Sequence, residues 1–370
     1  MAVYPKVLSL IPEMNGCAMW RTVWPAEMLQ QQGYFAAWDW SHNDSVVDVI
    51  HLFDIICYPR QAWTDMEAAQ KFIDNAHRFG KVIITEIDDD VYEWREQQKS
   101  HAELGIDKQQ ATIEENRASL LMMDGATVST HRLKSVIQSF APDDFPVEVV
   151  ANYIDLDWWR MMTHGWDRQV DGLTIGWAGG DRYEEEFRVL GEAWRRIART
   201  YPNVLFVIQG HQPRHLVEAV PEDRLIPIDW LPITGGPDKP PYCVGLLNID
   251  IMCCTVEQTM FNACKTPIKA YEATASGAAV VGTQWLYGQA IDNGKNGLIA
   301  NTVDEWEQAL SYLIDNPKKR AKFQRKMMKK IQSQYSLRVN AWNWSEAWRR
   351  IYAQAVPRIK NRVLIPGIDS

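Results

Sequence analysis

The stretch TPIKAYEATASGAAVVGT, residues 266–283, reads as a short helix followed by a strand. Thr266 suits the N-cap of that helix, Pro267 its first turn, and Gly277 the position just beyond its C-cap. The run 278–283 is apolar and contains β-branched residues, which predicts a buried strand. We therefore expect a helix that leads directly into a strand, the repeating unit of parallel α/β sheets.

The same alternation of strands and helical segments extends toward both ends of the chain. The expected strands are 6–11, 54–58, 81–87, 125–130 and 147–152 in the first part, and 173–178, 204–210, 224–228, 248–254 and 278–283 in the second. Strands that are apolar throughout and joined by helices predict parallel sheets covered on both faces. Because 370 residues exceed what one hydrophobic core usually serves, we expect two α/β domains.

The polar stretch THGWDRQVDG, residues 163–172, is the expected boundary between these domains. We place the first domain at 1–165 and the second at 170–335. The segment from Thr302 to Ser333 should form two helices broken at Asn316–Pro317, and the Trp-rich segment 337–360 a further helix. Residues 336–370 are therefore a C-terminal helix and tail.

Composition excludes several classes of protein. A net charge of −8 disfavours bulk nucleic-acid binding, and no window approaches the roughly 18 apolar residues of a membrane span. The apolar run near the start is too short for a secretion signal, so we expect a cytoplasmic protein with free thiols. The six cysteines show no zinc-site spacing, and we predict no metal site.

Ligands of open α/β sheets bind beyond the carboxyl ends of the strands, so residues there are candidates for a site. Lys269 and Glu272 are three residues apart and share one face of the expected helix, with Lys265 at its mouth. Two lysines beside a helix N-terminus would suit a diphosphate, and the carboxylate would suit a ribose diol. The alternative is a capped surface helix with an ion pair between Lys269 and Glu272.

The run FNACKTPIKAYEATASGAAVVG (261–282), with NGKNGLIANTVDEWEQALSYLIDNP (293–317), resembles retaining glycosyltransferases of the GT-B fold. The resemblance is to the family 4-like transferases, also called glycosyl transferases group 1, in the variant with FN-x-x-K-[ST]-x-x-K-x-x-E. Weaker similarity follows in the expected order along the chain at 16–33, 81–94, 124–137, 149–159 and 174–187. The implied fold is two Rossmann-like, doubly wound parallel-sheet domains that face a central cleft, with 336–370 packing back toward the first domain.

The resemblance implies roles for individual residues. The second domain would bind the donor through Gly179, Gly180, Arg182, Lys265, Lys269, Glu272 and Ser276. The first domain would bind the acceptor through Asn15, Gly16 and Arg21. Two departures from the family pattern stand out. Cys264 occupies the place of the first glutamate in the commoner motif, and the acidic run Glu184–Glu186 replaces the usual lysine, for which Arg182 would substitute.

Three further residues are candidates for catalysis. Asp88 and Asp90, with Asp89 between them, follow a strand and should face the cleft, where these carboxylates could act as a base, contact the acceptor, cap a helix or bind a cation. The resemblance favours acceptor contact or capping over a metal. His131 begins a helix after a strand, where it could contact the sugar or the leaving phosphate, or be solvated.

The implied activity is transfer of a sugar, with retention, from a nucleotide diphosphate sugar (UDP- or GDP-sugar) that binds as a substrate and not as a tight cofactor. The acceptor hydroxyl could belong to a carbohydrate, a lipid, a protein or a hydroxylated nucleobase in DNA. The alternatives are a nucleotide-sugar binding protein or an epimerase of the same fold.

Two surface features add expectations. The basic segment 318–330 carries an apolar stripe of Phe323, Met327 and Ile331, so it should be a packed, solvated helix. The alternative is a contact for nucleic acid or for anionic lipid at the inner membrane face. Among 17 tryptophans, we expect Trp20, Trp24 and Trp285 near the cleft. Trp306, Trp342, Trp344 and Trp348 should instead pack in the core.

Overall fold

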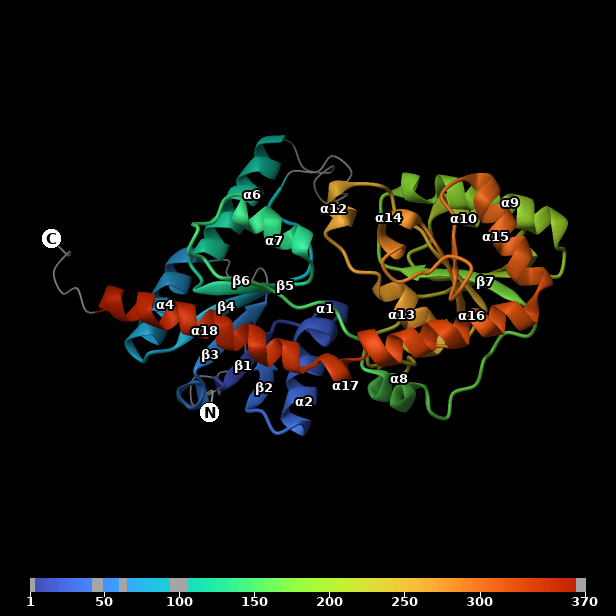
Figure 1. Cartoon of the computed structure of the whole chain (residues 1–370). Helices are drawn as coiled ribbons and strands as arrows, with labels where there is room; N and C mark the ends of the chain where they lie inside the picture. Colours follow the sequence, from blue (N-terminus) through green and yellow to red (C-terminus); the bar gives the residue numbers. More distant parts are fainter. Residues whose placement is uncertain (1–3, 42–48, 60–64, 94–105, 364–370) are drawn as a thin grey trace.

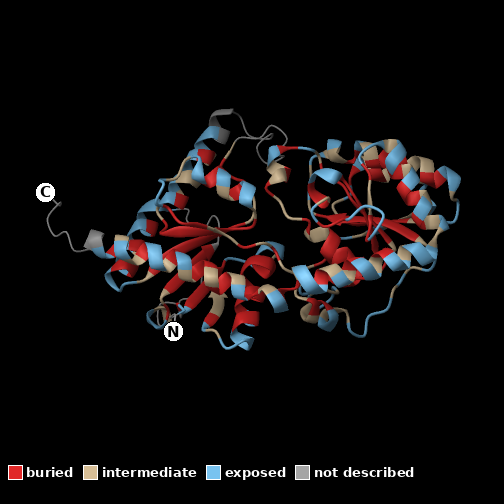
Figure 2. Ribbon diagram, in the orientation of Figure 1, coloured by how far each residue is buried: buried red, intermediate tan, exposed pale blue. Residues whose placement is uncertain are grey.

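The computed structural model describes residues 4–41, 49–59, 65–93 and 106–363. In this part of the chain, two six-stranded parallel sheets, each flanked by helices, lie side by side (Figure 1). The strands of both sheets are mostly buried (Figure 2). This is the predicted pair of doubly wound α/β units. The stretch 364–370 of the expected tail lies outside the described residues.

The first sheet has the strand order β2-β1-β3-β4-β5-β6. Its strands are β1 (Val7–Ile11), β2 (Ala36–Trp40), β3 (Ile55–Pro59), β4 (Val82–Ile87), β5 (Gly125–Val128) and β6 (Val147–Val149). The helices of this half are α1 (Gly16–Ala18), the π-helix η1 (Met19–Val23), α2 (Trp24–Gln31), the 3-10 helix η2 (Ile50–Leu52), α4 (Met66–Arg78), α6 (Ile106–Leu121) and α7 (His131–Gln138). The next helix along the chain, α8 (Leu156–Thr163), contacts the second half.

The second sheet has the order β12-β11-β10-β7-β8-β9. Its strands are β7 (Thr174–Gly179), β8 (Leu205–Gly210), β9 (Leu225–Ile228), β10 (Ile251–Cys254), β11 (Ala279–Gly282) and β12 (Leu298–Ile299). Its helices are η3 (Glu184–Phe187), α9 (Arg188–Thr200), α10 (Arg214–Val217), η4 (Glu222–Arg224), α11 (Tyr242–Leu246), α12 (Met260–Ala263), α13 (Ile268–Ala275), α14 (Gln284–Tyr287), α15 (Val303–Asp315) and α16 (Pro317–Lys330).

Both strand orders reverse direction inside the sheet, and such a reversal opens a ligand crevice at the carboxyl ends of the strands. In the second sheet the chain leaves β7 toward β8 and returns to β10, so the crevice lies between β7 and β10. The residues directly after β7 are Gly180 and Asp181. The topology therefore places the predicted glycine loop at the ligand-binding edge.

The end of the chain returns to the first half. After α16, the π-helix η5 (Ile331–Tyr335) and the short α17 (Leu337–Asn340) lead to α18 (Trp342–Val363), which packs against β4, β5 and β6 of the first sheet (Figure 1). Gly125 on β5 makes this close approach possible, because a Cβ there would lie 2.7 Å from Cγ2 of Ile351. Sequence similarity implied this return, although the expected single helix is broken at residue 341.

Local capping explains why several helices begin where they do. Thr302 and Glu305 form a reciprocal capping box at the start of α15, and the Asp65 carboxylate accepts hydrogen bonds from the first turn of α4. The predicted cap of α13 is wrong. Pro267, not Thr266, is the N-cap residue, and the Thr266 hydroxyl instead accepts a hydrogen bond from Asn152.

The remaining differences from the sequence expectations have physical reasons. β2 was not expected, because its sequence AAWDW is half-buried at the edge of the sheet and lacks a run of apolar residues. Trp306, Trp344 and Trp348 are buried as predicted, but Trp342 at the start of α18 is 51% exposed. The α16 stripe of Phe323, Met327 and Ile331 is buried, which confirms a packed helix. No described helix is both long and apolar enough to cross a bilayer.

Candidate functional site

A cavity of about 850 Å³ lies between the two halves, and both contribute to its lining. The first half contributes Met14, Asn15, Gly16, Cys17, Trp20, Asp88, Asp89 and Asn152. The second half contributes the glycine loop after β7 and the residues that follow β9. It also contributes residues of α12 and α13, with Lys265 between them. This volume is typical of sites that enclose a drug-sized or larger ligand.

The glycine loop after β7 forms one wall of this cavity. A Cβ on Gly179 would lie 2.6 Å from Nζ of Lys269 and 2.9 Å from the Trp177 ring, so this position has no room for a side chain. Gly180 lies against the ring of Trp230, which also lines the cavity and is 59% exposed. Both glycines line the cavity, and the ammonium of Lys269 lies against Gly179.

Helix α13 supplies a half-buried lysine and a buried carboxylate to the same cavity. The Lys269 ammonium donates to the carbonyl of Ala178 at 2.6 Å, and burial together with the Arg182 guanidinium lowers its pKa to about 8. Burial raises the pKa of Glu272, although Lys269 and hydrogen bonds from Tyr242 and Trp20 oppose this shift. The Tyr242 hydroxyl donates to Glu272 Oε2 at 3.3 Å.

Two further cations line the cavity. Nζ of Lys265 lies 2.6 Å from Oδ1 of Asp89, which belongs to the first half, and 4.4 Å from the centre of the Phe261 ring. The Arg182 guanidinium lies 3.6 Å from Glu186 Oε2. The predicted cluster of Gly179, Gly180, Arg182, Lys265, Lys269 and Glu272 is therefore gathered in one cavity.

Some residues predicted for the first half also line the cavity. Asn15 is the N-cap of α1, where its side chain accepts from the backbone N–H of Ala18, and Gly16 follows it. Asp88 lines the cavity beside Asp89. Trp20 lines it too, whereas Trp24 is buried. Trp285 does not line the cavity itself, although its indole donates to the carbonyl of the lining residue Thr259.

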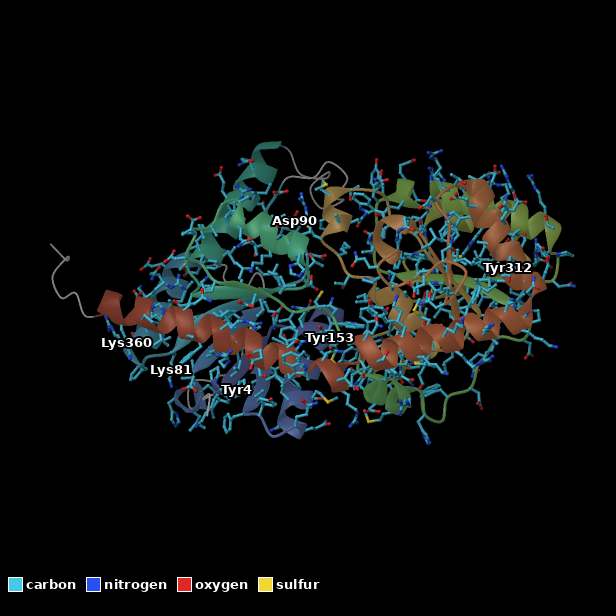
Figure 3. The ribbon with its side chains drawn as sticks, viewed as in Figure 1. Tyr4, Lys81, Asp90, Tyr153, Tyr312 and Lys360 are labelled. Carbon is cyan, nitrogen blue, oxygen red and sulfur yellow. The ribbon has the colours of Figure 1, made fainter. Side chains whose placement is uncertain are left out.

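Four residues predicted for the site are not among those that line the cavity. Asp90 is fully buried, and its carboxylate accepts from the backbone of Tyr92 and from the Cys264 thiol across the junction of the halves (Figure 3). His131 is exposed on the first turn of α7. Ser276 is the C-cap residue of α13, and its hydroxyl accepts from the Trp159 indole.

Arg21, the fourth of these residues, is buried behind the cavity. Its guanidinium lies 2.5 Å from Glu86 and donates to the carbonyl of Val150 and the side chain of Asn152. Burial raises the pKa of Glu86 to about 7 although the Arg21 charge lowers it. Arg21 thus holds elements of the first half together, and Asn152, which lines the cavity, is its link to the site.

Sequence reasoning missed several lining residues, among them Asn152, Trp230 and Tyr242. Trp230 follows β9 and Asn152 follows β6, both at carboxyl ends of strands. Because ligands bind beyond these ends, counting every polar or aromatic residue after a strand as a candidate would have included both. Tyr242 opens a short helix and reaches Glu272 only through the tertiary fold. All six cysteines are free thiols, and the described residues contain no cluster of metal-ligating side chains.

Comparison with known proteins identifies the fold and a family match. Residues 172–316 match the sequence profile described as Glycosyl transferases group 1. No curated protein matches the chain by sequence. HepE from Anabaena in complex with UDP-glucose is 11% identical with a TM-score of 0.59, over 97% of this chain and 100% of HepE.

Two other solved structures are similar. Sucrose-phosphate synthase from Thermosynechococcus elongatus is 11% identical with a TM-score of 0.60, over 94% of this chain and 99% of that protein. TarM from S. aureus is 14% identical with a TM-score of 0.55, over 80% of this chain and 54% of TarM. This chain therefore spans about half the length of TarM. It has the GT-B fold of these structures, and its residues 172–316 match the group 1 glycosyl transferases.

Proposed function

We propose that the protein is a glycosyltransferase that moves a sugar from a nucleotide diphosphate sugar to an acceptor hydroxyl with retention of configuration. The observation that carries this proposal is the convergence of Lys265, Lys269, Arg182 and Glu272 on one cavity beside the loop at Gly179. The family match over 172–316 and the UDP-glucose bound to HepE support it.

The second half would hold the donor. Three cations and the glycine loop suit the diphosphate, and the buried Glu272 carboxylate suits the two ribose hydroxyls. Negative charge grows on the leaving phosphate as the bond to the sugar breaks. Cations that are already in place in the cavity stabilise that charge without rearranging during the reaction. This stabilisation lowers the activation barrier of sugar transfer.

The described acceptor-side lining favours an uncharged acceptor. Its charged residues are Asp88 and Asp89, both negative, and none of its described residues is a lysine or arginine. Carboxylates accept hydrogen bonds from sugar hydroxyls but repel phosphates. We therefore propose a carbohydrate hydroxyl as the acceptor, in preference to a phospholipid or a modified base in DNA.

The test is a panel of UDP-, GDP-, dTDP- and ADP-sugars, with release of the nucleotide as the signal and neutral oligosaccharides as acceptors. We expect release with one nucleotide class, and NMR of the product should show the anomeric configuration of the donor. Epimerised donor in place of product would instead identify an epimerase. The transferase proposal fails if no donor gives either nucleotide release or a thermal shift.

A second candidate, nucleotide-sugar binding without transfer, is favoured by Cys264. At the position of the first glutamate in the commoner motif, this chain has a fully buried thiol 3.8 Å from Asp90, so no carboxylate from this position reaches the sugar. Under this alternative the panel would show a thermal shift with one donor but no release of nucleotide with any acceptor.

The pH dependence of donor binding should report on Lys269. With a pKa of about 8, its ammonium is charged below pH 8 and loses the charge above it. Affinity for UDP should therefore be constant from pH 6.5 to 7.5 and fall by about tenfold toward pH 9. Lys269→Arg keeps the charge at all these values. Its UDP affinity should stay flat, and an equal decline in this variant would contradict the assignment.

A further inference from the structure

One ion pair crosses the cavity from one half of the molecule to the other. Lys265 precedes α13 in the second half, and its ammonium lies 2.6 Å from Oδ1 of Asp89 in the first half. The side chains are 18% and 27% exposed, so the pair is shielded but not sealed from solvent. Both residues line the cavity, and a ligand there can reach either one.

The residues on both sides of Lys265 are held in place by the first half. The Thr130 hydroxyl donates to the carbonyl of Cys264 at 3.0 Å, and the Asn152 amide donates to the Thr266 hydroxyl at 2.8 Å. The Lys265 side chain carries four rotatable methylene units between this anchored backbone and its ammonium. Lys265 can therefore change its partner by rotation of the side chain, without separation of the two halves.

The other cavity lysine is held differently. The Lys269 ammonium donates to the carbonyl of Ala178, which belongs to its own half, and no described carboxylate forms an ion pair with it within 4 Å. Lys265 is thus the cavity lysine whose charge is already matched by a carboxylate of the opposite half. A phosphate that approaches this ammonium therefore meets Asp89 as a competitor for it.

We propose that Asp89 is an affinity-setting residue that competes with the donor diphosphate for Lys265. This inference rests on the proposed function, since it assigns the phosphates to this cavity. When the diphosphate binds, the ammonium turns from Asp89 to a phosphate oxygen, whose greater negative charge attracts it more strongly. The exchange makes and breaks no covalent bond and moves no proton.

The exchange links the two substrates. Before the donor arrives, the Lys265 charge masks the Asp89 carboxylate on the acceptor side of the cavity. After the exchange, that carboxylate faces the acceptor hydroxyls without its lysine. An acceptor that uses Asp89 therefore binds after the donor, so the order of binding follows from a single ion pair.

The test is calorimetric titration of inorganic pyrophosphate, UDP and uridine into the full chain without divalent metal. Asp89→Asn removes the competing charge while keeping the side-chain size. It should bind pyrophosphate and UDP about three- to tenfold more tightly and uridine unchanged, because uridine has no phosphate. Weaker or unchanged binding of pyrophosphate and UDP in this variant would overturn the proposal.

Two matched variants separate competition from a general effect of charge. Asp88→Asn removes a neighbouring negative charge but leaves the pair with Lys265, so its gain should be less than about twofold. In a Lys265→Met background, Asp89→Asn should give no gain, because the ammonium under competition is gone. An equal gain in either case would show simple repulsion and refute the competition.

The donor site and the competition between Asp89 and phosphate for Lys265 are tested by different outcomes. If the unmodified protein binds neither pyrophosphate nor any nucleoside diphosphate, the proposed function and this inference fall together. If it binds UDP and the Asp89→Asn gain is absent, the inference alone fails and the donor site stands.

Discussion

Glu272→Gln should bind nucleoside diphosphates about 100-fold more weakly than the unmodified protein. The Glu272 carboxylate is 6% exposed and faces the cavity, where it would accept hydrogen bonds from both ribose hydroxyls. Hydrogen bonds to a buried charge are strong. The amide of glutamine has one neutral oxygen that accepts, and its NH2 group cannot accept a hydrogen bond from the second ribose hydroxyl. Calorimetric titration of UDP and GDP would measure the loss.

The matched control is Glu305→Gln. Glu305 belongs to the capping box of α15, where glutamine can replace it, and it does not line the cavity. This variant should keep the affinity of the unmodified protein. The assignment of Glu272 to the ribose is wrong if Glu272→Gln binds UDP as tightly as the control while keeping its melting temperature.

Arg21→Met should destabilise the folded protein by about 3–5 kcal/mol at pH 8, because it leaves the Glu86 carboxylate buried without its counter-charge. Both side chains of this pair are 3% exposed. Burial already raises the pKa of Glu86 to about 7, and the variant loses the charge that restrains this shift. Thermal unfolding at several pH values would measure the effect.

The loss of stability in Arg21→Met should depend on pH. A carboxyl whose pKa is raised by folding stabilises the folded state at low pH, and this stability is lost as the pH rises through the folded pKa. The Arg21→Met deficit should therefore be smaller at pH 6 than at pH 8, and Glu86→Gln in the same chain should recover part of it. Arg350→Met breaks a more exposed pair with Glu148 and should cost about 1 kcal/mol. Equal losses for the two arginine variants would refute the argument.

Much of the fold could be predicted from the sequence because the central strands are mostly apolar. Runs such as 81–87 and 204–210 have no alternation, and this pattern is specific for strands buried on both faces. The edge strand β2 has no such run, and Trp342 has the composition of a core residue but lies exposed at a helix start. The pattern of apolar residues within one segment does not show whether that segment lies in the centre of a sheet, at its edge or at the protein surface.

The donor side of the site could be predicted for a similar reason. Lys265, Lys269 and Glu272 belong to one short segment, so their spacing fixes their relation before the chain folds. The acceptor side is assembled from distant loops. Arg21 and Asp90 have the right residue types and follow the right elements, yet both are turned into buried contacts with Glu86 and Cys264. Which way such side chains point is decided by tertiary packing.

The path of α18 sets the order in which the chain can fold during synthesis. This last helix buries Trp344, Trp348 and Ile351 in the core that also contains β1, β3 and β4. Domains usually fold from the N-terminus as they emerge from the ribosome, but the first sheet lacks part of its cover until residue 359 has been made. The second sheet has its last covering helix, α16, by residue 330, so it can be completed before the first sheet, although it is translated later.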